Sequence, residues 1–132
     1  EHIFLIVDLV TNVLVTTAPG ASSLMAILSL SSERIDKFNY LGFLPANNTE
    51  RSAALQNLRN ENGTWIVMDT PYRLKAVLSD LAREMPPNAR ALLGLNLTQP
   101  DETLLEGTFK ELEKNCPMDE AEFIILKYAN KI

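Results

Sequence analysis

Apolar residues recur at helical spacing in three parts of the chain. The clearest case is residues 74–81, where four apolar side chains stand at positions i, i+3, i+4 and i+7: Leu74, Val77, Leu78 and Leu81. This spacing places all four on one face of an amphipathic helix. A second apolar face (Leu24, Met25, Ile27 and Leu28) predicts a helix after Ser22, and a third (Ala54, Leu55 and Leu58) predicts a helix that ends at Asn60.

Local signals indicate where these helices begin and end. Thr49 is expected to be the N-cap of the middle helix, and Asn62-Gly63 is expected to stop it. Asp69 or Thr70 is expected to cap the helix that starts at Pro71, because proline is tolerated at the first helical position. Thr108 and Glu111 have capping-box spacing, which predicts one more short helix.

Short apolar and β-branched runs between these helices predict strands. The predicted strands are residues 38–44, 64–68, 89–97, 103–105 and 123–128, with a further short one at 13–17. Residues 3–10 are apolar on nearly all sides and fit either a buried helix turn or a strand. Since strands alternate with helices, the sequence predicts an α/β (α+β) domain: a mixed sheet of about five strands flanked by helices.

Composition is that of an ordinary globular protein and excludes several kinds of active site. The chain has 132 residues, of which 46% are hydrophobic and 22% charged. His2 is the only histidine and Cys116 the only cysteine, so neither a zinc site nor a nucleophile–histidine pair is expected in the body of the domain. No glycine-rich phosphate-binding loop is present, and no metal is expected.

Charge and hydropathy restrict the partners and the location. The formal net charge is −5, and eight acidic residues lie between Asp101 and Glu122. An acidic surface repels phosphate, so nucleic-acid binding by this chain alone is disfavoured. The longest apolar stretch, residues 3–15, is too short and too polar to span a bilayer, so no membrane association is expected. A single cysteine fits a reducing compartment, which favours the cytoplasm.

Two turns are the best candidates for a ligand site. Residues 69–73 lie between a predicted strand and a predicted helix, where free N–H groups often bind ligands in α/β folds. Residues 96–98 place polar groups at the end of an otherwise apolar strand. Each turn also has a purely structural interpretation, namely a well-capped helix and a strand end.

The order of the motifs resembles one known family. In sequence they are Pro19-Gly20-Ala21-Ser22-Ser23-Leu24, Phe38-Asn39-Tyr40-Leu41-Gly42-Phe43-Leu44-Pro45, Glu50-Arg51, Asp69-Thr70-Pro71-Tyr72-Arg73, Asn96-Leu97-Thr98, Glu106-Gly107-Thr108 and Glu122-Phe123. This succession resembles the tetrapyrrole (corrin/porphyrin) methylases. Within that family it is most similar to the branch that methylates a ribose 2′-hydroxyl of small-subunit ribosomal RNA, in its short variants with Thr-Pro-Tyr-Arg.

The resemblance implies a two-domain methyltransferase with S-adenosylmethionine in the cleft between its domains. Residues 1–18 would be the last helix and strand of the first domain, and residues 19–132 the second domain. The chain would then be an inactive fragment of a longer enzyme that acts on ribosomal RNA. The resemblance is compatible with a homodimer, and it leaves the catalytic residues unknown. By the same resemblance six residues would lie near the cofactor: Asp69, Thr70, Pro71, Tyr72, Asn96 and Thr98. Arg73 would face the substrate.

Two departures from the family pattern leave alternatives open. Ribosomal RNA members carry Ser-Pro-His-Arg at positions 70–73, and Arg-Glu-Leu-Thr-Lys where residues 95–99 read Leu-Asn-Leu-Thr-Gln. The glutamate and lysine of that second motif are therefore replaced by Asn96 and Gln99. One alternative is a non-catalytic binding or dimerisation module that keeps the methylase fold. Another is a methylase that acts on a tetrapyrrole.

Overall fold

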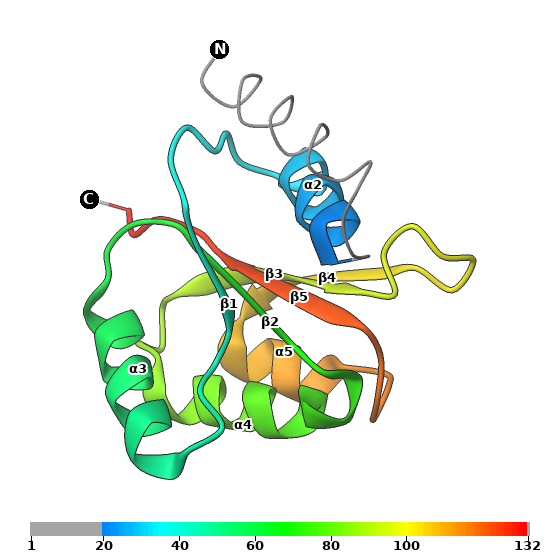
Figure 1. The fold of residues 1–132 in the computed structure, drawn as a ribbon. Coiled ribbons are helices and arrows are strands. Elements are labelled where there is room, and N and C mark those ends of the chain that lie inside the picture. The colour runs from blue at the N-terminus through cyan, green and yellow to red at the C-terminus, as the bar shows by residue number, and fades with distance from the viewer. Residues whose placement is uncertain (1–19, 132) are drawn as a thin grey trace.

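The computed structural model describes residues 20–131 and contains one mixed sheet of five strands (Figure 1). The strands are β1 (Asn39–Phe43), β2 (Trp65–Asp69), β3 (Arg90–Leu95), β4 (Thr103–Thr108) and β5 (Phe123–Lys127). This confirms the predicted α/β class with a mixed sheet. The predictions for residues 3–10 and 13–17, and the proposed boundary after residue 18, lie outside the described residues.

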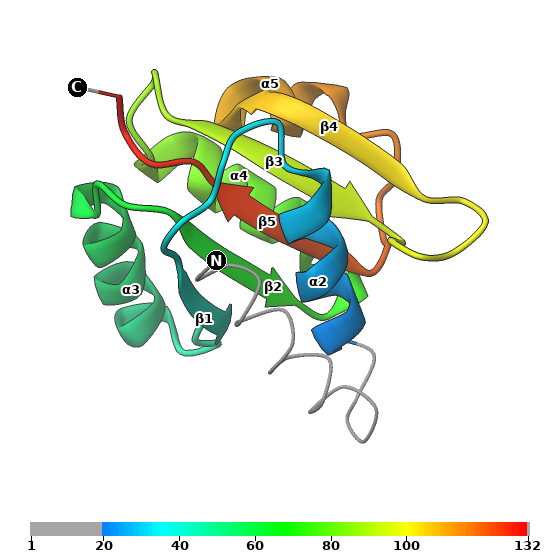
Figure 2. The same ribbon diagram turned by 90° about the horizontal axis from the view of Figure 1, so that it is seen from above.

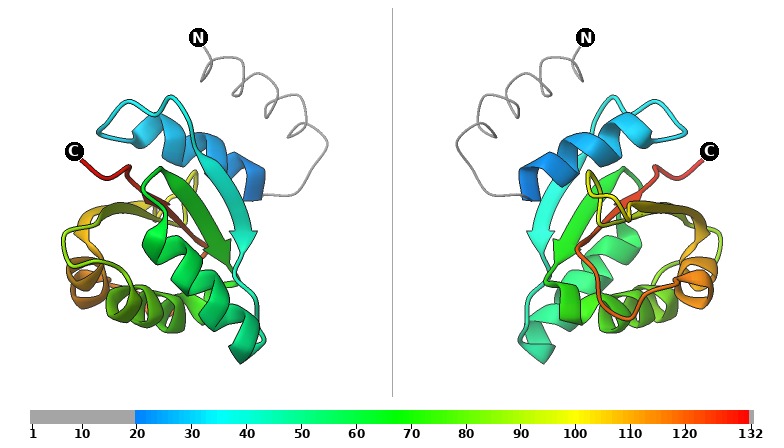
Figure 3. Two further views of the ribbon diagram at one scale, coloured as in Figure 1. Left: turned by 90° about the vertical axis from the view of Figure 1, so that its left-hand side faces the viewer. Right: turned by 90° about the vertical axis from the view of Figure 1, so that its right-hand side faces the viewer.

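Four α-helices and one 3-10 turn within the described residues cover the two faces of the sheet. They are α2 (Gly20–Leu30), α3 (Asn48–Asn60), η1 (Pro71–Arg73), α4 (Leu74–Glu84) and α5 (Phe109–Asn115). Helix α2 lies on one face and contacts β5 and β3, whereas α3, α4 and α5 lie on the other side (Figures 2 and 3). The sheet is therefore the middle layer of three.

The last strand of the chain occupies the centre of the sheet. The strand order is β1-β2-β5-β3-β4, so β5 pairs antiparallel with both β2 and β3. Since β2 and β3 are both antiparallel to β5, they run in the same direction as each other, and β1 is parallel to β2. The carboxyl ends of β1, β2 and β3 consequently lie at one edge of the sheet.

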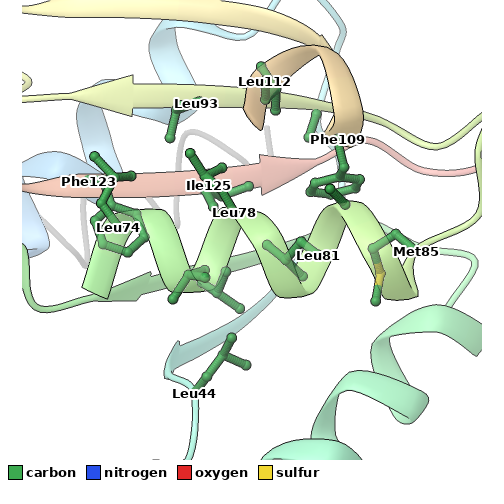
Figure 4. Packing of buried hydrophobic residues seen from close by; sticks show 14 of the residues in the cluster. Leu44, Leu74, Leu78, Leu81, Met85, Leu93, Phe109, Leu112, Phe123 and Ile125 are labelled. Atoms are coloured by element: carbon green, nitrogen blue, oxygen red, sulfur yellow. The ribbon is translucent and has the colours of Figure 1, made fainter. Parts of the chain in front are cut away.

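Alternation along the strands divides the apolar side chains into two cores. In β2, Trp65 and Val67 face the larger core under α3, α4 and α5, whereas Ile66 faces the smaller core under α2. Figure 4 shows side chains of α4, α5 and β5 meeting in the larger core. All five residues of β5 are buried, as expected of a strand that is covered on both faces.

The amphipathic pattern predicted the longest helices well, and their ends less well. Helix α4 buries all four residues of the predicted apolar face, and the capping box between Thr108 and Glu111 is present at α5. The predicted N-cap Thr49 is wrong, because the Asn47 side chain accepts hydrogen bonds from the backbone of Thr49 and Glu50. Asparagine and threonine are both good N-caps, so residue type alone does not distinguish neighbouring positions.

Other predicted ends are shifted in the same way. Helix α2 begins at Gly20, so Ser22 lies inside its first turn rather than before it. Helix α3 ends at Asn60 as predicted, but its C-cap is Glu61 in an extended conformation and not the Asn62-Gly63 pair. Strand β4 continues to Thr108, beyond the predicted end at 105, and β3 is shorter than predicted.

A small polar cluster fixes the end of α2 to the sheet. Glu106 of β4 accepts hydrogen bonds from the Ser32 and Tyr128 hydroxyls, and Tyr128 also accepts one from the Ser32 backbone. These hydrogen bonds, from Ser32 first and Tyr128 second, hold the pKa of Glu106 below its ordinary value. The segment after α2 is thereby connected to β4 and to the residue that follows β5.

Lys127 is the most deeply buried charged residue among those described. It lies in β5 with 2% of its surface exposed, and its ammonium group donates to the backbone oxygens of Glu61 and Gly63 at 2.9 and 3.1 Å. This lysine therefore satisfies the carbonyl groups after α3. Burial lowers the pKa of Lys127 from its ordinary 10.5, and the charge of Glu61 opposes that change only in part.

The lowered pKa predicts how stability changes in alkaline solution. Between the folded-state pKa of Lys127 and the unfolded value of about 10.5, the unfolded chain binds more protons than the folded chain. The unfolding free energy of the wild type, relative to Lys127→Met, should therefore rise as pH increases through this window and be constant below it. Urea unfolding at a series of pH values measures this difference. Lys75→Met controls for the loss of one surface charge, and a difference that falls with pH contradicts the prediction.

Gly94 of β3 leaves space for the side chain of Leu97, which packs back onto its own strand. A Cβ atom at Gly94 would lie 2.6 to 3.0 Å from three side-chain carbons of Leu97, which is itself buried in the smaller core. The loop after β3 thus turns back over its own strand, and only glycine leaves room for it.

Gly94→Ala should destabilise the protein by about 1–3 kcal/mol, because overpacking forces Leu97 and the loop to move. Gly63→Ala is the matched control, since its Cβ would meet only the end of the Glu61 side chain, at 3.2 Å. Thermal or urea unfolding measures both. The double variant Gly94→Ala/Leu97→Ala should lose less unfolding free energy than the sum of the losses in the two single variants. Strict additivity would show that the contact between residues 94 and 97 is not the cause.

Candidate functional site

The two turns singled out in the sequence lie at the same edge of the sheet. Asp69 is the last residue of β2, Leu95 is the last of β3, and both pair with Phe123 of β5. Since strands are about 5 Å apart, the backbones at Asp69 and Leu95 are separated by about 10 Å. The fold therefore brings residues 69–73 and 96–98 to the two sides of Phe123, although 22 residues lie between the two segments.

The turn after β2 contains two buried oxygens without hydrogen-bond partners. Asp69 is 5% exposed; its Oδ1 accepts a hydrogen bond from the Thr70 backbone at 2.8 Å, while Oδ2 has no hydrogen-bond partner. The Thr70 hydroxyl is also buried and unpartnered, so Thr70 is the N-cap of η1 without a side-chain capping bond. Buried polar atoms are nearly always satisfied, and two of the four exceptions among the described residues are in this turn.

The next three residues present different groups at the same place. Pro71 begins η1, as its fixed φ favours, and Tyr72 is 70% exposed, which makes it the most exposed large apolar residue described. Arg73 lies with one guanidinium nitrogen 3.6 Å from Asp69 Oδ2. This distance is short enough for an ion pair but too long for a hydrogen bond. Asp69 Oδ2 can therefore still accept a hydrogen bond.

Asn96 fixes the start of the loop after β3 to the start of β5. Its backbone N–H donates to the Glu122 carbonyl at 2.8 Å, and its side-chain oxygen accepts from the Glu122 N–H at 3.1 Å. The side-chain nitrogen of Asn96 donates to Asp101 at 2.9 Å. Because both ends of this carboxamide are engaged within the chain, Asn96 acts here mainly on the shape of the loop.

The same loop contains two non-glycine residues in the left-handed region. Asn96 has φ 49° and Thr98 has φ 67°, and these are the only such residues described. Asparagine tolerates this conformation, whereas for β-branched threonine it is an outlier that costs about 1–3 kcal/mol. Thr98 is exposed, and its backbone N–H donates to the Glu102 side chain at 2.8 Å.

Sequence reasoning missed the role of Glu102 at this edge, and it noted Glu122 and Phe123 only as a motif without their structural part. Gln99 donates to the Glu122 side chain at 2.9 Å, and Glu102 accepts from Thr98, so both carboxylates hold the loop. The only local signal is that Glu102 follows Thr98 by four residues, which is within reach across a tight loop.

A hollow lies elsewhere, along the edge strand β1. Its volume is about 350 Å³, and its walls are mostly apolar, with Leu41, Phe43, Leu58 and Trp65 among them. None of the residues predicted to bind a ligand lines it. The candidate site is therefore the polar edge beside Phe123 and not this hollow.

Comparison with known proteins identifies the family. The family model for tetrapyrrole (corrin/porphyrin) methylases matches residues 5–113. The ribosomal RNA small subunit methyltransferase I of Xylella fastidiosa (strain Temecula1) is 36% identical over 116 residues, which cover 85% of this chain and 42% of that protein. The protein of the same name from Micromonospora olivasterospora is 39% identical over 101 residues, covering 76% of this chain and 32% of that protein. The chain thus spans less than half of these relatives.

Solved structures agree on the fold. The cobalamin biosynthetic enzyme cobalt precorrin-4 methyltransferase superposes with a TM-score of 0.60 at 14% identity, over 80% of this chain and 48% of that one. The methyltransferase CobJ gives 0.57 at 10% identity, over 80% of this chain and 47% of the other. Sequence and fold lead to the same conclusion: this chain belongs to the tetrapyrrole (corrin/porphyrin) methylase family.

Proposed function

We propose that this chain is the second domain of an S-adenosylmethionine-dependent methyltransferase that modifies a ribose 2′-hydroxyl of small-subunit ribosomal RNA. Sequence relatives named for ribosomal RNA support the substrate, at 36% and 39% identity against 14% for the cobalamin enzyme. The relatives are more than twice as long as the matched segment. That difference supports a two-domain protein in which residues 19–132 form the second domain and the chain alone is inactive.

The single observation that carries the proposal is the pair of buried oxygens without hydrogen-bond partners in the turn after β2. Asp69 Oδ2 accepts hydrogen bonds and the Thr70 hydroxyl can donate or accept one. S-adenosylmethionine offers matching groups, because it carries an ammonium, two ribose hydroxyls and an exocyclic amine. It is also a net cation at neutral pH, which suits an edge bordered by the carboxylates of Asp69 and Glu122.

Each residue of the edge has a proposed part in holding the cofactor. Asp69 and Thr70 would bind it through the two oxygens, while Pro71 sets the turn and exposed Tyr72 shields the cofactor from water. Thr98 and the backbone shaped by Asn96 would contact it from the other side of Phe123. When bound, S-adenosylmethionine supplies an electrophilic methyl group on a sulfonium, and these residues hold and orient it.

Arg73 is the residue of this edge that we propose to face the RNA. A guanidinium suits phosphate, but Arg73 is the only cation in either of the two turns. A net charge of −5 makes the chain a poor binder of RNA by itself. Most of the affinity for RNA would therefore come from the remainder of the enzyme or from a second copy in a homodimer, in the cytoplasm where ribosomes are assembled.

A non-catalytic module with the methylase fold is the second candidate function. The observation in its favour is that Asn96 and Gln99 are both engaged in hydrogen bonds within the chain. Neither side chain is then free to act on a substrate. This candidate predicts a folded full-length protein that binds no S-adenosylmethionine.

The full-length protein should bind S-adenosylmethionine in calorimetric titration and transfer labelled methyl groups to small ribosomal subunits or their RNA. The label should be found on ribose, as 2′-O-methylated nucleosides after digestion. The present chain alone should transfer none, because it provides one side of the cleft. If S-adenosylmethionine binds but no methyl group reaches RNA, the cofactor assignment stands and the proposed substrate is contradicted. If S-adenosylmethionine does not bind, the non-catalytic module is supported.

Thr70→Val separates a binding role of the hydroxyl from a structural one. Valine has the shape of threonine, and removing a buried hydroxyl that has no partner should leave unfolding free energy unchanged or raise it by up to about 1 kcal/mol. The same change should weaken S-adenosylmethionine binding by the full-length protein about fivefold, the equivalent of one neutral hydrogen bond. Calorimetry and thermal unfolding measure the two effects, and Thr64→Val, at a buried threonine before β2, is the control for binding. Loss of stability with unchanged binding would assign the hydroxyl to the fold.

A further inference from the structure

The loop after β3 has a conformation that local sequence does not favour. Thr98 is held at φ 67° although it is β-branched and exposed, so neither burial of its own side chain nor residue preference explains the conformation. A residue in such a conformation persists only where its surroundings determine it, and such residues cluster at ligand-binding sites. The groups that hold Thr98 are therefore of interest.

Two contacts determine the loop before Thr98. Leu97 is 3% exposed and packs over Gly94, which fixes the turn to its own strand. Asn96 is connected to Glu122 by two hydrogen bonds and to Asp101 by one. These contacts fix residues 96 and 97, but none of them involves the N–H or the hydroxyl of Thr98.

One side chain holds Thr98 itself. Glu102 Oε1 accepts a hydrogen bond from the Thr98 N–H at 2.8 Å, and Glu102 in turn donates its backbone N–H to Gln99 at 3.0 Å. A carboxylate that accepts from an N–H makes one of the stronger hydrogen bonds of proteins. Glu102 therefore closes the loop with both its side chain, bound to Thr98, and its backbone, bound to Gln99.

We propose that Glu102 is a positioning residue for cofactor binding: its carboxylate holds Thr98 in the left-handed conformation that presents the Thr98 hydroxyl and the adjoining backbone to S-adenosylmethionine. This inference rests on the proposed function. Without the carboxylate, Thr98 relaxes toward ordinary φ values, and only a fraction of molecules has the competent loop. The apparent Kd then rises by the inverse of that fraction.

The test compares Glu102→Ala and Glu102→Gln with wild type in the full-length protein. Glu102→Ala should raise the Kd for S-adenosylmethionine about fivefold, as expected from the loss of one net hydrogen bond. If the enzyme transfers methyl groups, KM for the cofactor should rise by the same factor, with kcat within about twofold of wild type. Glu102→Gln keeps an acceptor oxygen and should restore most of the affinity.

A matched control is present at the other end of β4. Glu111 accepts a hydrogen bond from the Thr108 backbone N–H at 2.9 Å, which is the same kind of contact in the capping box of α5. Glu111→Ala should lower the unfolding temperature at least as much as Glu102→Ala without changing the Kd. Hydrogen exchange should show faster exchange of the Thr98 amide in Glu102→Ala only.

The outcomes separate the inference from the proposed function. Wild type that binds S-adenosylmethionine, together with Glu102→Ala that binds equally well, overturns the positioning role and leaves the cofactor assignment intact. If Glu111→Ala also raises the Kd fivefold, general loss of stability is the cause, and the positioning role of Glu102 is overturned as well. Wild type that does not bind the cofactor overturns both.

Discussion

The pairing of β5 with both β2 and β3 is the constraint on which the candidate site depends. β2 and β3 do not pair with each other, and β5 is the strand that lies between them in the sheet order. Phe123, its first residue, pairs with Asp69 on one side and with Leu95 on the other. Until this last strand is in place, the two polar turns have no fixed relation. Ordering of the edge is thus coupled to completion of the sheet, and the fully buried β5 supplies the apolar contacts that stabilise it.

The two turns at this edge differ in how their polar groups are used. In the turn after β2, two buried oxygens keep unused hydrogen-bonding capacity. In the loop after β3, most polar side chains are engaged with one another, and the cost of two left-handed residues is offset by those bonds. One turn therefore has polar groups that are not used within the chain, and the other has a shape fixed by its own hydrogen bonds. A site made of the two turns would have a fixed shape on the β3 side and unused hydrogen-bonding atoms on the β2 side.

Local patterns were enough to predict the elements, and contacts between distant segments were needed for the rest. The amphipathic spacing of α4 and the capping box of α5 depend on residues three or four apart, so the sequence alone predicts them. The choice of Asn47 over Thr49 as N-cap, and the position of β5 in the sheet, depend on how distant segments pack. The positive φ values of Asn96 and Thr98 follow from the packing of Leu97 on Gly94 and from the bonds to Glu122 and Glu102, which local propensity does not contain.

Asn96 shows how a motif position and the observed contacts of a side chain give different information. Family resemblance assigned Asn96 to the cofactor because of its position in a motif. The structure shows its carboxamide engaged with the Glu122 backbone and the Asp101 carboxylate, so the observed contacts of this side chain stabilise the loop. A carboxamide can accept from a backbone N–H and donate to a carboxylate at once, whereas a carboxylate at this position could still accept from the Glu122 N–H but would repel Asp101. Asparagine at position 96 is thus matched to one acidic neighbour, Asp101, and to the Glu122 backbone, and the carboxamide brings no acid or base of its own to this loop.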